Sequence, residues 1–450
     1  MSGLRGDLSR KLLHIAMGGF AFLLHYLTWW QAALCALVAL ANNLFVLPRL
    51  GRRRFFRGEA KERGLDVGIV LYAVSVLILI LAFPQRLDLV AAAWAFLAFG
   101  DGLATIAGLA FGRASGPLPW NPQKSWAGFT GFVVAGVPMA LALFAWTGGW
   151  AITPAIALKF LAVGLVLAVL ESLETGINDN LLVPLAAGGL LYAVQLIDLS
   201  RVAAGRELLF ERLPWALGVN LAAAGLAYAL KTVDLSGVVN GVLLGSVIWL
   251  CLGGPGFAIL LAFFVLGSAA TKVGYRTKAK EGTAQEKGGR RGAAHAWANT
   301  GAPALFAALA FGAAQGNGLF RLAFVAALAT AVSDTLGSEI GQAFGRRTFL
   351  ITTFRPVPRG TDGAVSLEGT LAGIAGSIAL GLLGWGLGLI DGAGVAIVTA
   401  AAFVGTTLES YLGALLEQAR LINNEAQNFL NTLAGGLVAI LIAQLAHLAG

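Results

Sequence analysis

Two stretches of this sequence place one aspartate at the end of a long apolar run: FGDGLATIAGLAFGR (99–113) and VSDTLGSEIGQAFGR (332–346). In each stretch a Phe-Gly-Arg triplet follows, and its arginine comes twelve residues after the aspartate. The aspartates are Asp101 and Asp334, and the arginines are Arg113 and Arg346. An ionisable side chain costs about 2.5–3.5 kcal/mol at the centre of a bilayer. A pattern that carries this cost twice, in the same order, indicates a function.

The composition is that of a membrane protein. The chain has 450 residues, of which 58% are hydrophobic and only 12% are charged, against about 25% charged in soluble domains. The net charge of +8 lies mostly in loops, where anionic lipid headgroups explain it as readily as an anionic substrate does. The two cysteines lie in or beside apolar runs and predict neither a disulfide framework nor a zinc site.

The apolar runs predict an all-α polytopic membrane protein with about fifteen spans, at about 20 residues for each crossing. The first run lacks a small-residue cleavage site, so we expect an uncleaved span rather than a signal peptide. The predicted spans are 12–29, 32–48, 67–83, 88–104, 126–146, 153–171, 180–197, 214–230, 237–251, 256–271, 294–313, 318–336, 367–388, 392–411 and 427–448. An amphipathic or re-entrant piece remains open at 32–48 and at 237–251.

Two basic loops predict the orientation. Residues 49–63 carry seven Lys or Arg against two acids, residues 272–291 have the same balance, and the loops at the opposite ends of the spans are nearly uncharged. By the positive-inside rule, the N-terminus and both basic loops are cytoplasmic. Both aspartates, with the polar loops that follow them, then lie at the cytoplasmic face.

The similarity between the two halves extends beyond the aspartates. KSWAGFTGFVVAG (124–136) corresponds to VSLEGTLAGIAGS (365–377), and the phrase Leu-Glu-Ser recurs at 170–172 and 408–410. The predicted spans that bear the aspartates are eight apart, an even number, so the two sets run in the same direction. We therefore expect two parallel, duplicated helical units, at 1–200 and 201–450.

The polar residues of each half suit phosphoryl transfer, in which catalysis consists mostly of positioning and charge stabilisation. Carboxylates hold Mg²⁺ together with substrate phosphates, and Arg, Lys and glycine backbone N–H groups bind phosphate oxygens. Each piece also has a structural reading. An aspartate at a span end can be a cap or half of an ion pair, and Arg113, Arg346 and Lys124 can anchor the chain at the interface. His14 fits an interfacial or packed histidine, and residues 178–180 fit a turn that opens the next helix.

At these motifs the first half resembles the CTP-dependent polyprenol kinases of the phytol kinase and dolichol kinase group. The matching stretches are RKLLHIAMGG (10–19), FGDGLATIAGLAFGR (99–113), NPQKSWAGFTG (121–131) and ESLETGINDNLLVPL (171–185). The second half resembles the membrane family that contains phytyl-phosphate kinase, at residues 267–304, SDTLGSEIGQAFGR (333–346), GAVSLEGTLAG (363–373) and LES (408–410).

The resemblance implies a bifunctional enzyme. Residues 1–200 would phosphorylate an isoprenoid alcohol, such as phytol or geranylgeraniol, and residues 201–450 would phosphorylate the resulting monophosphate, with CTP as donor and Mg²⁺ as cofactor. The implied catalytic residues are Asp101, Glu171, Asp179, Asp334 and Glu409, of which Asp101 and Asp334, with Glu339, would hold the metal. The implied nucleotide-binding residues are Arg113, Lys124, Ser125, Gly128, Asn180, Arg346, Ser366 and Gly369, and Lys272, Arg290 and Arg291 would hold the phosphate of the prenyl monophosphate.

One departure weakens the implication for the second half, where Val365 stands in the place of Lys124. Three alternatives also remain open. The chain could be a cytidylyltransferase that joins CMP to a lipid phosphate, or a transporter built from parallel repeats. In the third alternative, one half is degenerate and only supports the other.

Overall fold

The computed structural model describes residues 11–50, 67–119, 121–173, 177–275, 290–361, 363–414 and 424–446. The chain divides into two compact units between Gln195 and Leu196, five residues before the predicted boundary. The assignment of one kinase activity to each unit stays a prediction. Most of the basic loop 49–63, and residues 276–289 of the second basic loop, lie outside the described residues.

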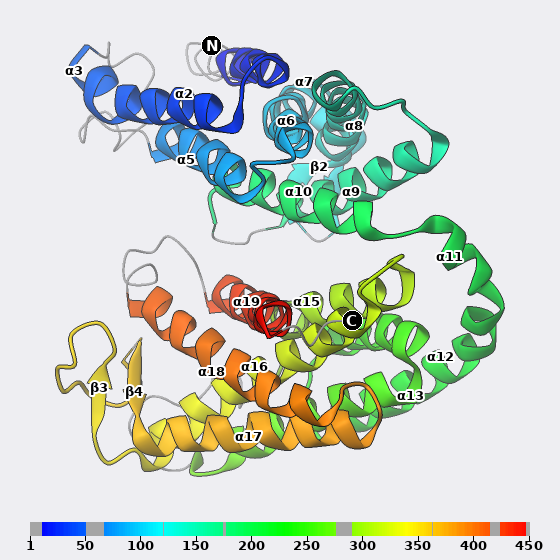
Figure 1. Ribbon diagram of the computed structural model, residues 1–450, viewed down its shortest axis with the longest axis vertical. Helices are drawn as coiled ribbons and strands as arrows, with labels where there is room; N and C mark the ends of the chain where they lie inside the picture. Colours follow the sequence, from blue (N-terminus) through cyan, green and yellow to red (C-terminus); the bar gives the residue numbers. More distant parts are fainter. Residues whose placement is uncertain are drawn as a thin grey trace. The chain divides into compact units, whose positions relative to one another are not determined.

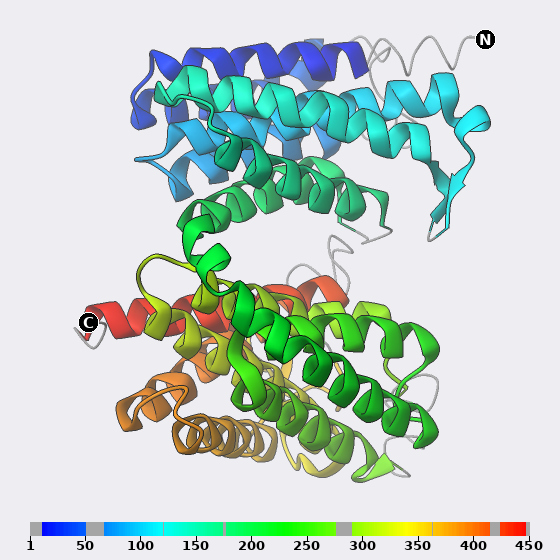
Figure 2. The ribbon, with the colours of Figure 1, turned by 90° about the vertical axis from the view of Figure 1, so that its right-hand side faces the viewer.

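The first unit is a helical bundle with one small hairpin (Figure 1). It begins with a helical segment, Lys11–His25, whose last part is the 3₁₀ helix η1 (Gly18–His25). Its helices after that are α2 (Trp29–Ala41), the π-helix η2 (Asn42–Val46), α3 (Leu47–Leu50), α5 (Val67–Ala82), α6 (Leu87–Ala95), the π-helix η4 (Phe96–Asp101), α7 (Gly102–Ser115), α8 (Trp126–Gly148), α9 (Pro154–Ser172) and α10 (Asp179–Leu196). The antiparallel strands β1 (Pro117–Leu118) and β2 (Asn121–Ser125) connect α7 to α8 (Figure 2, cyan).

The second unit repeats this plan of helices with one hairpin. Its helices are α11 (Leu199–Ala204), α12 (Arg206–Ala229), α13 (Leu235–Lys272), α15 (Ala293–Gly312), α16 (Asn317–Phe344), α17 (Leu367–Gly386), α18 (Gly392–Leu412) and α19 (Asn424–Leu445). The antiparallel strands β3 (Thr348–Leu350) and β4 (Ala364–Ser366) connect α16 to α17 (Figure 1).

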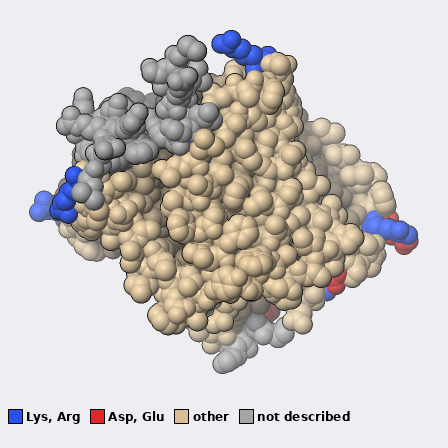
Figure 3. Space-filling model, turned by 90° about the horizontal axis from the view of Figure 1, so that it is seen from above, with Lys and Arg blue, Asp and Glu red and all other residues tan. Residues whose placement is uncertain are grey.

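Ten helices of the described residues are long and apolar enough to cross a membrane. All fifteen predicted spans fall on helices, but the structure groups some of them differently. The predicted pair 237–251 and 256–271 forms one long helix, α13, which bends at Gly253, where φ is +69°. The segments Lys11–His25 and α5 are shorter than the ten, and neither α12 nor α15 is among them, so the number fifteen stays a prediction. On the face drawn in Figure 3, the charged side chains of the described residues lie at the margin, and the rest of that face shows none of them. This arrangement suits a protein surrounded by the apolar interior of a membrane.

Each unit is built around one buried helix, and that helix carries the repeated aspartate. Of the most apolar 18-residue stretch in the segment Leu87–Ser115, 72% is buried, and the corresponding share in α16 is 67%. In the other candidate spans this share is only 11–39%. Small side chains allow this close packing: residues 91–93 and residues 326, 327, 329 and 331 are all alanine and almost wholly buried. The central helix therefore fixes the position of Asp101 or Asp334 relative to every helix around it.

Candidate functional site

Asp101 lies inside the first unit at the end of the π-helical segment η4, and only 4% of it is exposed. Single π-helical turns inside α-helices occur frequently at functional sites. The Lys11 ammonium lies 2.7 Å from Oδ2 of Asp101, and Nε2 of His14 lies 3.3 Å from the same oxygen. Nε2 of His14 is also 2.9 Å from the carbonyl oxygen of Leu97. The first helical segment therefore supplies two nitrogen groups to an aspartate about 90 residues further along the chain.

Three carboxylates meet at this point. Asp101, Glu171 from the last turn of α9 and Asp179 from the first turn of α10 each offer one oxygen, and these oxygens all lie within 4.8 Å of one another. Like charges this close oppose ionisation unless a cation lies among them. Oxygen-only ligands from carboxylates are what Mg²⁺ binds. The three residues therefore fit a divalent cation, and among the described residues this is the one group of three potential metal ligands of this kind.

Lys124 stands beside the three carboxylates. Its ammonium forms an ion pair with Glu171, which lies in the last turn of α9. Burial lowers the pKa of Lys124, but Glu171, and more weakly Asp179 and Asp101, outweigh burial, so that the pKa is raised above its ordinary value of 10.5. Lys124 therefore remains a cation at neutral pH. Three carboxylates and two lysines, Lys11 and Lys124, thus form one compact group of charges.

The hairpin that carries Lys124 holds the start of α8 against α7. The Ser125 hydroxyl accepts a hydrogen bond from the backbone N–H of Gly128 at 3.2 Å and so caps α8. A Cβ on Gly112 of α7 would lie 3.1 Å from this hydroxyl, and one on Gly128 would lie 3.2 Å from the carbonyl oxygen of Ala104. The role of Ser125 and Gly128 that the structure shows is therefore helix capping and close packing.

The second unit repeats this local arrangement. The Ser366 hydroxyl accepts a hydrogen bond from the backbone N–H of Gly369 at 3.1 Å and caps α17. A Cβ on Gly345 would lie 3.0 Å from the Ser366 hydroxyl, and one on Gly369 would lie 2.4 Å from the carbonyl oxygen of Gly337. Gly112 and Gly345 each follow their aspartate by eleven residues, as Ala104 and Gly337 each follow it by three. A common origin of the two units stays a prediction, but the two frameworks correspond at these four pairs of positions.

The acids of the second unit are arranged differently. Asp334 is half-buried on α16, Glu339 one turn later is 3% exposed, and Glu409 lies near the end of α18. Where the first unit pairs its glutamate with a lysine, the Glu409 carboxylate accepts a hydrogen bond from the side-chain amide of Gln427 on α19. Val365, at the position of Lys124, offers no charge.

Of the three cations predicted to bind the substrate phosphate, only Arg291 points into the second unit. Lys272 and Arg290 are exposed. The Arg291 guanidinium lies 5.8 Å from the centroids of the Phe263 and Phe264 rings, and a Cβ on Gly267 would lie 2.7 Å from its Nη2. Burial lowers the pKa of Arg291, and the nearby Glu339 opposes this shift. Arg291 is therefore a half-buried cation near one of the predicted metal ligands.

The remaining predicted nucleotide-binding residues lie at the edges of these clusters. Arg113 is exposed on the last turn of α7, and Arg346 is exposed just after α16, where its backbone N–H donates to Glu368 at 3.3 Å. The side chain of Asn180 donates to the carbonyl oxygen of Gly68 at 2.9 Å, a contact that ties α10 to α5. The sequence argument missed Lys11 as a partner of Asp101 and gave no role to Gln427.

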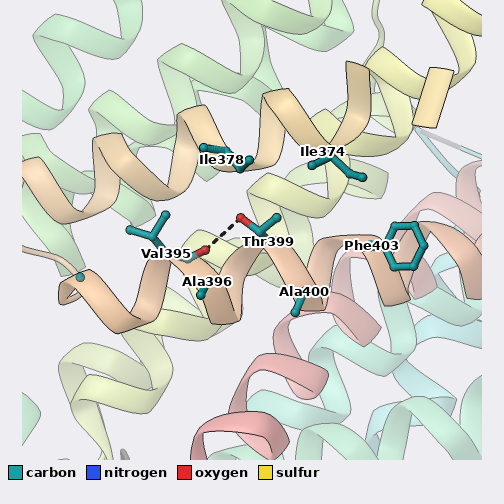
Figure 4. Close-up of a pocket in the computed structure, with 8 residues that line it drawn as sticks. Ile374, Ile378, Val395, Ala396, Thr399, Ala400 and Phe403 are labelled. Atoms are coloured by element: carbon teal, nitrogen blue, oxygen red, sulfur yellow. Dashed lines mark hydrogen bonds between the residues drawn. The ribbon is translucent and has the colours of Figure 1, made fainter. Parts of the chain in front are cut away.

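An apolar groove lies between α17 and α18 in the second unit (Figure 4). It has a volume of about 670 Å³ and its lining includes Ile374, Ile378, Val395 and Phe403. The hydroxyl of Thr399 donates to the carbonyl oxygen of Val395 and so adds no polar group to the groove. In a membrane, acyl chains fill such a surface, so the groove alone does not identify a substrate site.

Comparisons with known proteins place this chain among integral membrane proteins. The model of the family described as integral membrane protein DUF92 matches residues 218–437. An uncharacterized membrane protein of Synechocystis sp., sll0875, is 46% identical over 208 residues, which are 46% of this chain and 81% of that protein. The protein VTE6, chloroplastic, of Arabidopsis thaliana is 41% identical over 213 residues, which are 46% of this chain and 64% of that protein.

A further relative carries a name that states an activity. Phytol kinase 1, chloroplastic, of Arabidopsis thaliana is 29% identical over 203 residues, which are 40% of this chain and 64% of that protein. This chain thus covers less than two thirds of VTE6 and of phytol kinase 1. No solved structure matches the chain. With 81% of the sll0875 protein covered at 46% identity, and with the family model matched across α12–α19, the chain belongs to the DUF92 family of integral membrane proteins.

Proposed function

We propose that the protein is a membrane kinase that phosphorylates an isoprenoid alcohol in its first unit and the resulting monophosphate in its second unit, with CTP as the donor. The observation that carries the proposal is the meeting of Asp101, Glu171 and Asp179 within 4.8 Å beside Lys11 and Lys124. Relatives named as a phytol kinase and a farnesol kinase support an isoprenoid alcohol as the substrate class.

The charges of the first unit suit a nucleoside triphosphate. The three carboxylates would hold Mg²⁺, which when bound draws the phosphate oxygens to the site and neutralises their charge. Lys11, from the first helical segment, and Lys124, from β2, both contact this group of carboxylates. Each ammonium can therefore bind a phosphate oxygen at the same place with only a small movement of its side chain. Phosphate contacts by lysine ammonium groups stabilise the charge that spreads over the transferred phosphoryl group.

The transfer itself needs few groups. The oxygen of the alcohol forms a bond to the γ-phosphorus of CTP, the bond from that phosphorus to the β-bridging oxygen breaks, and CDP leaves. The proton of the alcohol passes to a carboxylate, for which Asp179 and Glu171 are the candidates because they end α9 and begin α10 at the edge of the cluster. The prenyl chain of the substrate stays in the apolar region, so only its hydroxyl group has to reach the carboxylates.

In the second unit the substrate already carries a phosphate. Arg291 is the candidate for binding it, since its half-buried guanidinium lies 5.8 Å from the centroids of the Phe263 and Phe264 rings and near Glu339. A planar guanidinium binds phosphate oxygens in pairs. We place the active sites of both units at the cytoplasmic face, as the basic loops predict.

Labelled CTP tests the proposal. The purified protein, with Mg²⁺, geranylgeraniol and either γ-labelled or α-labelled CTP, should transfer only the γ-label to the lipid, and mass spectrometry should show the monophosphate and then the diphosphate. Transfer of the α-label would instead show a cytidylyltransferase. An absence of prenol-dependent CTP consumption would exclude the kinase and favour a transporter.

A further inference from the structure

A polar seam runs between α18 and α19 in the second unit. Two sets of three residues recur at every fourth position, so each set lies on one face: Gly405 and Glu409 on α18 with Gly413 at its C-cap, and Gln427, Asn431 and Gly435 on α19. The two faces meet. The Gln427 amide nitrogen donates to the Glu409 carboxylate and, at 3.2 Å, to the Glu409 backbone carbonyl.

Glycines make room for the amide side chains of this seam. A Cβ on Gly413 would lie 2.9 Å from Nε2 of Gln427, and one on Gly405 would lie 3.1 Å from Oδ1 of Asn431. Any larger residue at these two positions would push the amides away from α18. The space beside Glu409 therefore depends on the two glycines, Gly405 and Gly413.

Two buried oxygens of the seam find no hydrogen-bond donor in the described part of the chain. They are Oε1 of Gln427 and Oδ1 of Asn431, on residues that are each 3% exposed. The orientation of the Gln427 amide is fixed by its two bonds to oxygens of Glu409, because the reverse orientation would set oxygen against oxygen. Unpaired buried acceptors are rare in folded proteins, and two of them one turn apart indicate a ligand.

Asp334 lies at the level of the seam. Helices α16 and α18 run in the same direction, because a Cβ on Gly394 would meet Leu322 and one on Gly405 would meet Thr330. One turn beyond Thr330 on α16 comes Asp334, and one turn beyond Gly405 on α18 comes Glu409. Both carboxylates therefore stand one turn along from the same contact.

Gln427 occupies the place that Asp179 has in the first unit. Gln427 precedes Gly436 by nine residues, as Asp179 precedes Gly188, and these glycines pack against corresponding helices, α15 through Phe306 and α5 through Leu79. Val365 likewise stands at the position of Lys124. Compared with the first unit, the second therefore lacks one negative and one positive charge, and the sum of the charges at these two positions is the same in both units.

We propose that the oxygens of Glu409, Gln427 and Asn431, together with Asp334, form a divalent-cation site in the second unit in which carboxamides replace the third carboxylate of the first. An all-oxygen set of carboxylates and carboxamides is suited to Mg²⁺, Mn²⁺ or Ca²⁺. The inference rests on the proposed function only in taking this cluster as the metal site of the second unit. Binding of the metal alone tests it, without nucleotide or lipid.

Mn²⁺ titration of the purified full-length protein, followed through the paramagnetic resonance of free Mn²⁺, measures the site. The double variant Asp101→Asn/Glu171→Gln removes binding by the first unit and should retain one Mn²⁺ per chain. Adding Gln427→Leu or Asn431→Leu should weaken this remaining site at least tenfold. Adding Gln427→Glu should tighten it at least threefold, because it supplies a third carboxylate.

Gln195→Leu is the matched control, since it makes the same chemical change at a glutamine outside the seam, and it should leave the binding within twofold. Circular dichroism confirms that each variant is folded. The proposal is overturned if the double variant binds no Mn²⁺, or if folded Gln427→Leu and Asn431→Leu proteins bind it unchanged, or if Gln427→Glu does not tighten binding. A chain that binds Mn²⁺ as expected but transfers no phosphate would overturn the proposed function and leave this site in place.

Discussion

Lys124, at the end of the hairpin β1–β2, forms an ion pair with Glu171, 47 residues further along the chain. Glu171 is 6% exposed, so its charge has little access to water. The pair fixes the hairpin against the end of α9 and, at the same time, keeps the cation that we propose binds phosphate beside the carboxylates. In the proposed enzyme, the stability and the activity of the first unit therefore depend on the same contact.

Replacing Lys124 with methionine should reduce both. Removing one partner of a fully buried pair costs about 3–5 kcal/mol, and since the Lys124 side chain is about one third exposed we expect about 1–2 kcal/mol. The apparent Tm in detergent should fall, and phosphorylation of the alcohol should fall about 100-fold through loss of a charge contact in the transition state. The double variant Lys124→Met/Glu171→Gln should recover most of the Tm and none of the activity. An equal Tm for all variants would exclude the structural role of the pair.

The stability that Lys124 contributes should depend on pH only at strongly alkaline pH. The folded-state pKa of Lys124 is raised above 10.5, so the contribution is fully present below that value and is lost as the pH rises through the folded-state pKa. The difference in Tm between the wild-type protein and Lys124→Met should thus be constant between about pH 8 and 9. A scan of Tm against pH for both proteins measures it. A difference that vanishes already near pH 8 would show that Lys124 is neutral in the folded protein.

Asp101→Asn and Asp334→Asn should separate the two activities. Each asparagine keeps the shape of the side chain but removes the charge from one central helix, and loss of one charge-stabilising group lowers a rate by about 10²–10³. We expect Asp101→Asn to lower phosphorylation of the alcohol by about 10²–10³-fold and to leave phosphorylation of the monophosphate within twofold, and Asp334→Asn to do the reverse. Assays with each lipid supplied separately measure this. If either substitution removes both activities, the assignment of one site to each unit is wrong.

The sequence predicted the all-helical membrane fold and the repeat because both depend on local patterns. Apolar runs predicted the helices, and the aspartate, glycine and serine spacing predicted that the two halves match. Neither β-hairpin was predicted, and the capping roles of Ser125 and Ser366 were not predicted either. The relation between Lys11 and Asp101 depends instead on which helices pack together across 90 residues, and no local pattern states that. Helix α12 begins eight residues before the predicted span 214–230, and this added part carries Arg206, Glu207 and Arg212. Helix α12 is not among the ten helices long and apolar enough to cross a membrane.

A comparison of the charged residues in the two halves also misses one position of the site, Gln427. Gln427 is neutral where Asp179 is charged, so a comparison of acids in the two halves passes over it. The contact between Gln427 and Glu409, together with the packing of Gly436 and Gly188, indicates that the two positions correspond. Conversely, Arg113 and Arg346 repeat clearly in the sequence but are exposed in the structure, where their spacing is equally compatible with anchoring at the membrane interface.

Gly128 and Gly369, whose backbone N–H groups donate to the capping serines, should differ in their tolerance of replacement by alanine. A Cβ on Gly369 would lie 2.4 Å from a backbone carbonyl oxygen, which cannot move without shifting α16, whereas a Cβ on Gly128 would lie 3.2 Å from the corresponding oxygen. Overpacking of this kind costs about 1–3 kcal/mol, so Gly369→Ala should lower the apparent Tm clearly and Gly128→Ala only slightly. Gly386→Ala is the control in the same helix as Gly369, because a Cβ there meets nothing within 4 Å. Since Gly369 holds α17 against the helix that carries Asp334, we also expect Gly369→Ala to slow phosphorylation of the monophosphate more than that of the alcohol. A Gly369→Ala protein as stable as Gly386→Ala would show that the two helices are not in this close contact.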